Sequence, residues 1–200
     1  METEIEVKFL LLDRETIRQR ILASGVPSDG RVFESNIRFD TPGEDLYRSG
    51  ALLRLRQDHR AILTHKSRSV EKDPEFKVHR ELEVVVSDHD TMRRILEALG
   101  FKAVQWYEKY RETFHFDRAV ICLDTMPFGE FIEIEGEKET IRDLAKQLSL
   151  NWENRILLNY LEIFKRLGEK LRLPFKDLTF HHFSTVTQDI ASALKEISLR

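Results

Sequence analysis

Apolar and polar residues alternate along most of the first 136 residues of the chain. Residues 4–9 read Glu-Ile-Glu-Val-Lys-Phe, so every second side chain is apolar. Because successive side chains of a β-strand point to opposite faces, this pattern predicts a strand with one apolar and one charged face. Similar patterns predict further strands at residues 31–40, 51–56, 60–66, 78–86, 101–116, 119–124 and 131–135, with the one at 101–116 broken midway.

Three segments show a helical period instead. The first follows Asp13, a residue suited to the N-cap, and ends before Gly25. The second begins at residues 87–90, which fit a capping box, and ends at Gly100, while the third begins after Gly136. Each segment has a single apolar face, so each helix is expected to cover one side of a sheet.

From residue 151 onwards the pattern is entirely helical. Residues 152–173 are rich in Leu and Ile and are expected to form a helix that Pro174 ends. A last amphipathic helix is expected over residues 185–199. Since no flexible linker precedes these segments, this tail is expected to pack on the rest of the molecule.

The composition is that of a globular protein and excludes several classes. The 200 residues, of which 41% are apolar, suffice for one domain with a core. Cys122 is the single cysteine, which excludes a disulfide framework and a multi-cysteine zinc site. The net charge of −3 and the lack of a long apolar run or signal peptide predict a soluble, cytoplasmic protein without a nucleic-acid or membrane partner.

Charged residues recur two positions apart on five of the predicted strands, and on a sixth Lys66 stands two positions from Thr64. Residues at this spacing must share a strand face. The carboxylates in such positions are Glu4, Glu6, Glu81, Glu83, Asp124, Glu133 and Glu135. The cations are Lys8, Arg54, Arg56, Lys66, Lys109 and Arg111. For one strand alone, a solvent-exposed face is the ordinary explanation. Over six strands that explanation weakens, because neighbouring like charges destabilise a sheet unless a ligand compensates them.

A closed sheet reconciles these charges with the apolar alternate positions. About eight strands can close into a barrel that is wide enough for one small ligand. The predicted fold is therefore α+β: a closed antiparallel barrel with a charged interior and helices packed outside. Arg and Lys side chains bind phosphate oxygens, and clustered carboxylates suit hard Mg²⁺ or Mn²⁺. Carboxylates that can bind a metal ion, next to cationic side chains that can bind phosphate, predict a phosphoryl-transfer site.

Several short motifs follow one another along about four-fifths of the chain. They are Glu-x-Glu-x-Lys at 4–8, Phe-Asp-Thr at 39–41, Leu-Arg-x-Arg at 53–56, Leu-Thr-x-Lys at 63–66, Glu-x-Glu at 81–83, Lys-x-Arg at 109–111, Leu-Asp at 123–124 and Gly-x-Phe-x-Glu-Ile-Glu at 129–135. This ordered set resembles the CYTH family, the triphosphate tunnel metalloenzymes. That family includes class IV adenylate cyclases, thiamine triphosphatases and inorganic triphosphatases.

The resemblance implies an antiparallel tunnel that binds a triphosphate and two divalent metal ions. It implies a CYTH domain at residues 1–168 and a helical C-terminal extension at residues 169–200. The chain departs from the family pattern at Arg38, where many relatives carry Tyr, and at Asn159, where Ser is usual. Cyclases of the family tend to carry a His-Phe pair before the first Glu. Only three residues precede Glu4, which favours a phosphohydrolase.

The favoured hypothesis is a metal-dependent triphosphatase. The resemblance assigns Glu4, Glu6, Glu133 and Glu135 as the main metal ligands, with Glu81, Glu83 and Asp124 assisting. The substrate-binding residues would be Lys8, Arg54, Arg56, Lys66, Lys109 and Arg111, and the catalytic residues Glu4, Glu6 and Lys8. A class IV adenylate cyclase and a non-catalytic polyphosphate- or nucleotide-binding module are the alternatives. The choice among inorganic, thiamine and nucleoside triphosphates stays open, as does a homodimer.

Overall fold

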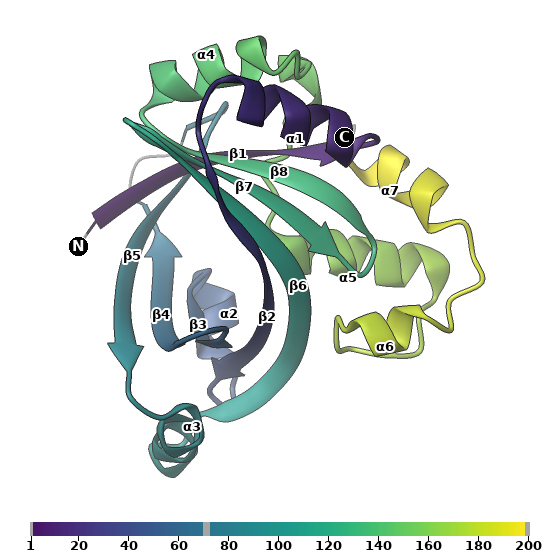
Figure 1. The fold of residues 1–200 in the computed structure, drawn as a ribbon. Coiled ribbons are helices and arrows are strands. Elements are labelled where there is room, and N and C mark those ends of the chain that lie inside the picture. Colours follow the sequence, from purple (N-terminus) through teal and green to yellow (C-terminus); the bar gives the residue numbers. More distant parts are fainter. Residues whose placement is uncertain (1, 70–72, 199–200) are drawn as a thin grey trace.

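Eight antiparallel strands form a closed ring in the computed structural model, which describes residues 2–69 and 73–198 (Figure 1). The strands are β1 (Glu2–Leu11), β2 (Ser28–Asp40), β3 (Leu52–Gln57), β4 (Ala61–Arg68), β5 (Lys77–Val86), β6 (Lys102–Phe116), β7 (Ala119–Met126) and β8 (Gly129–Gly136). Their order around the ring is β1-β5-β4-β3-β2-β6-β7-β8, and β8 pairs with β1 to close it. The predicted α+β class, with a closed antiparallel sheet and helices outside, is confirmed.

Strand β6 corrects one prediction, because it runs from Lys102 to Phe116 without the expected break. It pairs with β2 along most of its length and with β7 from Tyr110 onwards. The register with β2 shifts between Arg38 and Phe39, where Val104 of β6 is the extra residue, so β6 has a bulge near its start and no break. Pairing on both sides therefore keeps the long strand continuous.

Helices α1 (Arg14–Ala23), α3 (His89–Ala98) and α4 (Lys138–Gln147) confirm the three predicted helices. The apolar faces of α1 and α4 pack on outward-facing residues of β1, β7 and β8, including Val7 and Ile134, both 0% exposed. Helix α3 packs on β2 and β3. The capping prediction at residues 87–90 needs a correction, since Asp88 alone is the N-cap and accepts a hydrogen bond from Thr91 N. The patterns missed α2 (Asp45–Ser49), a single short turn.

The helix predicted over residues 152–173 is wrong in its first part. Residues Trp152–Asn154 form a 3₁₀ turn, and α5 (Tyr160–Leu171) begins only after Asn159, which forms a capping box with Glu162. Tertiary contacts explain the difference. The Trp152 ring packs against Phe9 and Phe76, and Ile156 N donates to Lys8 O at 2.7 Å, which keeps the intervening chain extended.

The C-terminal helices cover one end of the ring. Residues of α5, α6 (Phe180–Phe183) and α7 (Ile190–Ser198) share a hydrophobic cluster with Tyr107, Met126, Phe128 and Phe131 of β6–β8 and their connecting turn. The last helix starts at Ile190 and not at residue 185, and residue 199 lies outside the described residues. Helix α5 runs across residue 168, where the domain boundary was expected, so that boundary stays a prediction.

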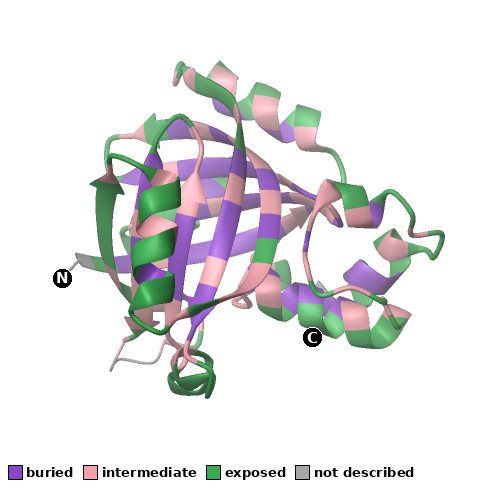
Figure 2. Cartoon of the chain, turned by 90° about the horizontal axis from the view of Figure 1, so that it is seen from below, coloured by how far each residue is buried: buried purple, intermediate pink, exposed green. Residues whose placement is uncertain are grey.

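Burial follows the alternation of the sequence. Figure 2 shows buried residues concentrated along the strands of the ring and on the helix faces that touch it. Among the described residues, no helix combines the length and the apolar character that crossing a membrane requires.

Candidate active site

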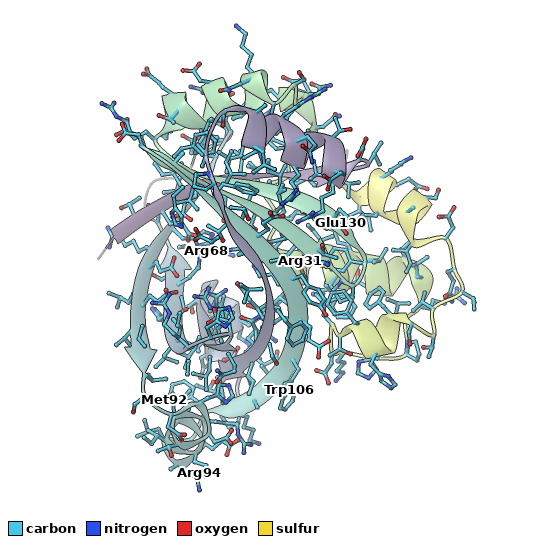
Figure 3. The ribbon with its side chains drawn as sticks, in the orientation of Figure 1. Arg31, Arg68, Met92, Arg94, Trp106 and Glu130 are labelled. Atoms are coloured by element: carbon cyan, nitrogen blue, oxygen red, sulfur yellow. The ribbon has the colours of Figure 1, made fainter. Side chains whose placement is uncertain are left out.

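The strand registers place the predicted site residues on the inward face of the ring. Figure 3 shows side chains pointing into the ring from the strands around it. Residues directly opposite each other on paired strands share a face. Lys8 is opposite Glu133, Arg111 is opposite Asp124, and Lys66 is opposite Glu81. The apolar residues between them face the helices, as the alternation predicts. The geometric part of the hypothesis, in which acids and bases of many strands converge, therefore holds.

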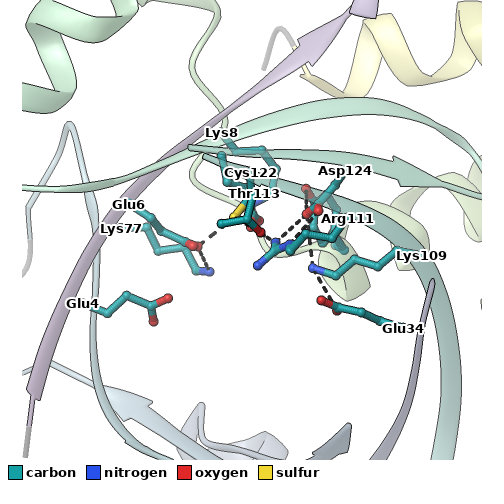
Figure 4. A network of polar contacts seen from close by, with 12 residues as sticks. Glu4, Glu6, Lys8, Glu34, Lys77, Lys109, Arg111, Thr113, Cys122 and Asp124 are labelled. Atoms are coloured by element: carbon teal, nitrogen blue, oxygen red, sulfur yellow. Dashed lines mark hydrogen bonds and ion pairs between the residues drawn. The ribbon is translucent and has the colours of Figure 1, made fainter. Parts of the chain in front are cut away.

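Asp124 of β7 is the centre of one wall, formed by β6–β8 (Figure 4). Its side chain is 0% exposed and accepts hydrogen bonds from Arg111 Nε at 2.7 Å and Arg111 Nη2 at 2.6 Å. It also accepts from Lys109 Nζ at 3.2 Å and from the Tyr160 hydroxyl at 2.9 Å. Two cations and a hydroxyl therefore occupy the oxygens of this carboxylate.

Lys8 and Glu133 continue this wall. The Lys8 ammonium pairs with Glu133 and lies 4.4 Å from the centre of the Tyr160 ring. Glu133 also pairs with Arg111. Burial alone would raise the pKa of Glu133, but the charges of Lys8 and Arg111 outweigh it and hold this pKa well below its ordinary value. Both carboxylates of this wall thus neutralise cations that were predicted to bind phosphate.

A second group of ion pairs joins β1, β4 and β5. Both Glu4 oxygens accept from Lys66 Nζ, at 2.6 and 2.5 Å, and Lys66 also contacts Glu81 at 3.1 Å. Glu6 pairs with Lys77. Burial by itself would raise the pKa of Glu6, but the positive charges of Lys77 and Lys8 outweigh this effect and lower the pKa to about 2. Lys77 was not among the predicted site residues, because it lies one residue before the predicted strand that carries Glu81 and Glu83.

The β2–β4 wall is more loosely paired. Arg54 Nη2 donates to Thr64 Oγ1 at 3.1 Å, and Thr64 donates to Glu83 at 2.9 Å. Arg56 lies 3.9 Å from Glu34 and 4.0 Å from Glu83. Glu34 of β2 is a further inward acid that the sequence analysis missed. Burial by itself would raise the pKa of Glu34, but the positive charges of Lys109 and Arg111 outweigh this effect and lower the pKa to about 2. Only its place on a predicted strand could have indicated it, since no second acid stands two positions away.

Most of the buried side-chain atoms that lack a hydrogen-bond partner in the described structure face this interior. They are Glu34 Oε2, Asn36 Nδ2 and Oδ1, His79 Nδ1, and the Nε atoms of Arg38, Arg54 and Arg56, while those of Arg14 and Arg155 lie elsewhere. A buried polar group without a partner costs about 1–3 kcal/mol. Their concentration in one place indicates that a polar ligand completes these hydrogen bonds.

The carboxylates have the chemistry of a site for a hard divalent cation. In the described part of the chain, no three acidic, His or Cys side chains are already arranged around one ion position, because lysines neutralise Glu4, Glu6 and Glu133. Glu135, at the end of β8, has no such partner among the described residues. Partial burial, followed by the charges of Glu4 and the nearby Glu6 and Glu81, raises its pKa to about 7. An oxygen-only cluster with surplus negative charge fits Mg²⁺ or Mn²⁺.

Binding of Mg²⁺ is expected to strengthen as the pH rises through about 7. A carboxylic acid that holds its proton cannot ligate a metal ion, and Glu135 loses its proton in that range. The raised pKa has the opposite effect on the stability of the fold. The folded state holds the Glu135 proton more tightly than the unfolded chain does, so the contribution of Glu135 to stability falls as the pH rises from the ordinary glutamate pKa towards 7. Calorimetric Mg²⁺ titrations at several pH values check the binding, and the Glu135→Gln variant is expected to lose most of the pH dependence. An unchanged dependence in that variant would assign it to another group.

Comparison with known proteins places the chain among enzymes of one family. Residues 2–166 match the family model described as the CYTH domain. A Methanocaldococcus jannaschii protein named "putative adenylate cyclase" is 27% identical over 172 residues, which cover 80% of this chain and 97% of that protein. The solved PH1012 protein of Pyrococcus horikoshii is 27% identical with a TM-score of 0.66, covering 80% of this chain and 98% of that one.

A more distant solved structure has the same fold. It is a putative adenylyl cyclase from Hippeastrum, described as having a dominant triphosphatase activity. It is 19% identical with a TM-score of 0.58, and the match covers 81% of this chain and 95% of that one. The ring of strands, its inward charges and the family match over residues 2–166 together show that this chain belongs to the CYTH domain family.

Proposed function

We propose that this protein is a divalent-metal-dependent hydrolase of triphosphates. One observation carries the proposal: unpartnered buried guanidinium and amide atoms face the same interior as a cluster of carboxylates around Glu135, whose pKa is raised by burial and by its acidic neighbours. The first set needs an anion and the second needs a cation. A triphosphate bound together with Mg²⁺ or Mn²⁺ supplies both.

The cations are proposed to bind the phosphate chain from several sides of the ring. Arg54 and Arg56 present guanidinium groups on one wall, and Arg54 Nε has no hydrogen-bond partner. Lys8, Lys109 and Arg111 face them from the opposite wall, and Lys66 lies on β4, where it pairs with Glu4 of β1. Their positive charge neutralises the chain and stabilises the charge that develops on the leaving phosphate.

The carboxylates of β1, β5 and β8 are proposed to hold the metal ions. Glu4, Glu6, Glu133 and Glu135 would be the main ligands, with Glu81 and Glu83 assisting. A bound divalent ion would act as a Lewis acid on the phosphate oxygens. For Asp124 we propose a positioning role in place of ligation, since its oxygens already hold Arg111, Lys109 and Tyr160. A neighbouring carboxylate that does not ligate the ion would orient the attacking water and accept its proton.

Incubation with tripolyphosphate, thiamine triphosphate and ATP, each with Mg²⁺ or Mn²⁺, tests the function. The expected result is metal-dependent release of orthophosphate from at least one of them, without cyclic nucleotide. The adenylate cyclase alternative is favoured by the name of the Methanocaldococcus jannaschii relative, and it predicts cyclic AMP and pyrophosphate from ATP. The dominant triphosphatase activity described for the Hippeastrum protein supports hydrolysis. Tight binding without any product would instead indicate a binding module.

A further inference from the structure

Besides Glu34, the inward face of β2 carries two further polar side chains that none of the motifs includes, Asn36 and Arg38. Asn36 is 0% exposed and lies opposite Arg56 on β3 and Tyr107 on β6. Neither its Nδ2 nor its Oδ1 has a hydrogen-bond partner in the described structure. A fully buried amide of this kind is costly for the fold unless a bound molecule completes its hydrogen bonds.

Arg38 lies directly opposite Arg54, so two guanidinium groups share one cross-strand pair. No ion pair joins Arg38 to a carboxylate among the described residues, and its Nε is buried without a hydrogen-bond partner. Its guanidinium lies 5.8 Å from the centre of the Tyr47 ring, and the Tyr47 hydroxyl accepts from Lys165 Nζ at 3.1 Å. Like charges on directly opposite residues destabilise a sheet, so this pair also calls for an anion.

The two long walls of the ring therefore differ in kind. On the β6–β8 wall, Arg111 is held by both oxygens of Asp124 and by Glu133. On the β2–β4 wall, Arg38 and Arg54 keep a buried Nε without a partner, while Arg56 Nε lies 3.1 Å from Asp58 Oδ2. The second wall thus offers three guanidinium groups to a ligand with several negative charges, and the Nε atoms of Arg38 and Arg54 are free to donate to it.

We propose that Asn36 and Arg38 contact the phosphate chain directly, and that Arg38 selects an inorganic chain over a nucleoside triphosphate. This rests on the proposed function and adds the substrate class to it. Both ends of tripolyphosphate are charged phosphates, whereas esterification to a nucleoside removes charge from one end. The guanidinium of Arg38, the third beside Arg54 and Arg56, is therefore better neutralised by tripolyphosphate than by a nucleoside triphosphate.

Calorimetric binding of tripolyphosphate and of ATP, without metal and at equal pH and salt, tests this independently of turnover. The Arg38→Gln variant is expected to bind tripolyphosphate at least about tenfold more weakly and to lose most of its preference over ATP. Arg38→Lys should restore part of the affinity, because it keeps the charge. The control Arg80→Gln, which removes an exposed Arg from the outward face of β5, should leave both affinities unchanged.

The Asn36→Leu variant separates ligand binding from a structural role. If the amide serves the ligand, replacing it with an apolar side chain of similar shape should keep or raise the melting temperature while lowering the affinity for tripolyphosphate. A lower melting temperature with unchanged affinity would overturn the assignment of Asn36. Equal losses for ATP and tripolyphosphate in Arg38→Gln, or a larger loss for ATP, would overturn the selectivity. Tight tripolyphosphate binding without hydrolysis would leave this inference standing and refute only the proposed function.

Discussion

The Glu4→Gln variant is expected to lose Mg²⁺-dependent triphosphate hydrolysis by about a thousandfold while keeping its fold. Glutamine retains the shape of the side chain but removes the charge that a divalent cation requires. The structure explains why the fold should tolerate this: Lys66, the partner of Glu4, also contacts Glu81 at 3.1 Å and keeps an acidic neighbour. Orthophosphate release at saturating substrate measures the first effect, and thermal unfolding measures the second.

Two further variants complete this test. Glu6→Gln should also abolish turnover, but with a larger loss of stability, because Glu6 is the carboxylate that pairs with Lys77. Glu153→Gln alters an acid whose side chain is 83% exposed, and it should change neither activity nor melting temperature. Activity retained with glutamine at both Glu4 and Glu6 would remove the basis of the metal assignment.

The Asp124→Asn variant is expected to have the largest effect on stability, a loss of about 3–5 kcal/mol in the free energy of unfolding. Asp124 is 0% exposed and is the shared acceptor of Arg111, Lys109 and Tyr160. Asparagine removes the charge that compensates two buried cations and turns one acceptor into a donor that faces them. Denaturant unfolding measures this loss, and triphosphate affinity should fall as well, since Lys109 and Arg111 lose their orientation.

Tyr160→Phe is the matched control for the Asp124 variant. It removes the 2.9 Å hydrogen bond to Asp124 but leaves both ion pairs and the aromatic ring in place. The expected loss is therefore about 1 kcal/mol, the usual value for one hydrogen bond. If Asp124→Asn costs no more than Tyr160→Phe, the ion pairs of this wall do not hold the interior together.

Repetition along single strands made much of the site predictable. Glu4 and Glu6, or Arg54 and Arg56, stand two residues apart, and the pleat of a strand places such neighbours on one face whatever the rest of the fold does. Glu34, Asn36, Arg38 and Lys77 are equally inward in the structure. None of them was predicted as a site residue, and Arg38 was noted only as a departure from the family pattern. Each is of a different kind from its same-face neighbours, so no recurring pair distinguishes them from ordinary polar positions.

The partners of these residues could not be predicted in the same way. The pairing of Asp124 with Tyr160 joins residues 36 positions apart, and it depends on α5 lying over the end of the ring. Likewise, α5 starts at Tyr160 and not at residue 152 because Trp152 packs on Phe9 and Phe76. Contacts between distant segments override local helical preference in both places.

The amino-acid sequence by itself determined which residues form strands and which side chains share a face, because both depend on a local period of two. It also carried the motifs of the family. Only the tertiary structure decided the order of strands around the ring and the continuity of β6. It also decided which charges neutralise one another and which stay unpartnered for a ligand. Those properties depend on the closure of the sheet and on packing between distant segments, which no short stretch of sequence specifies.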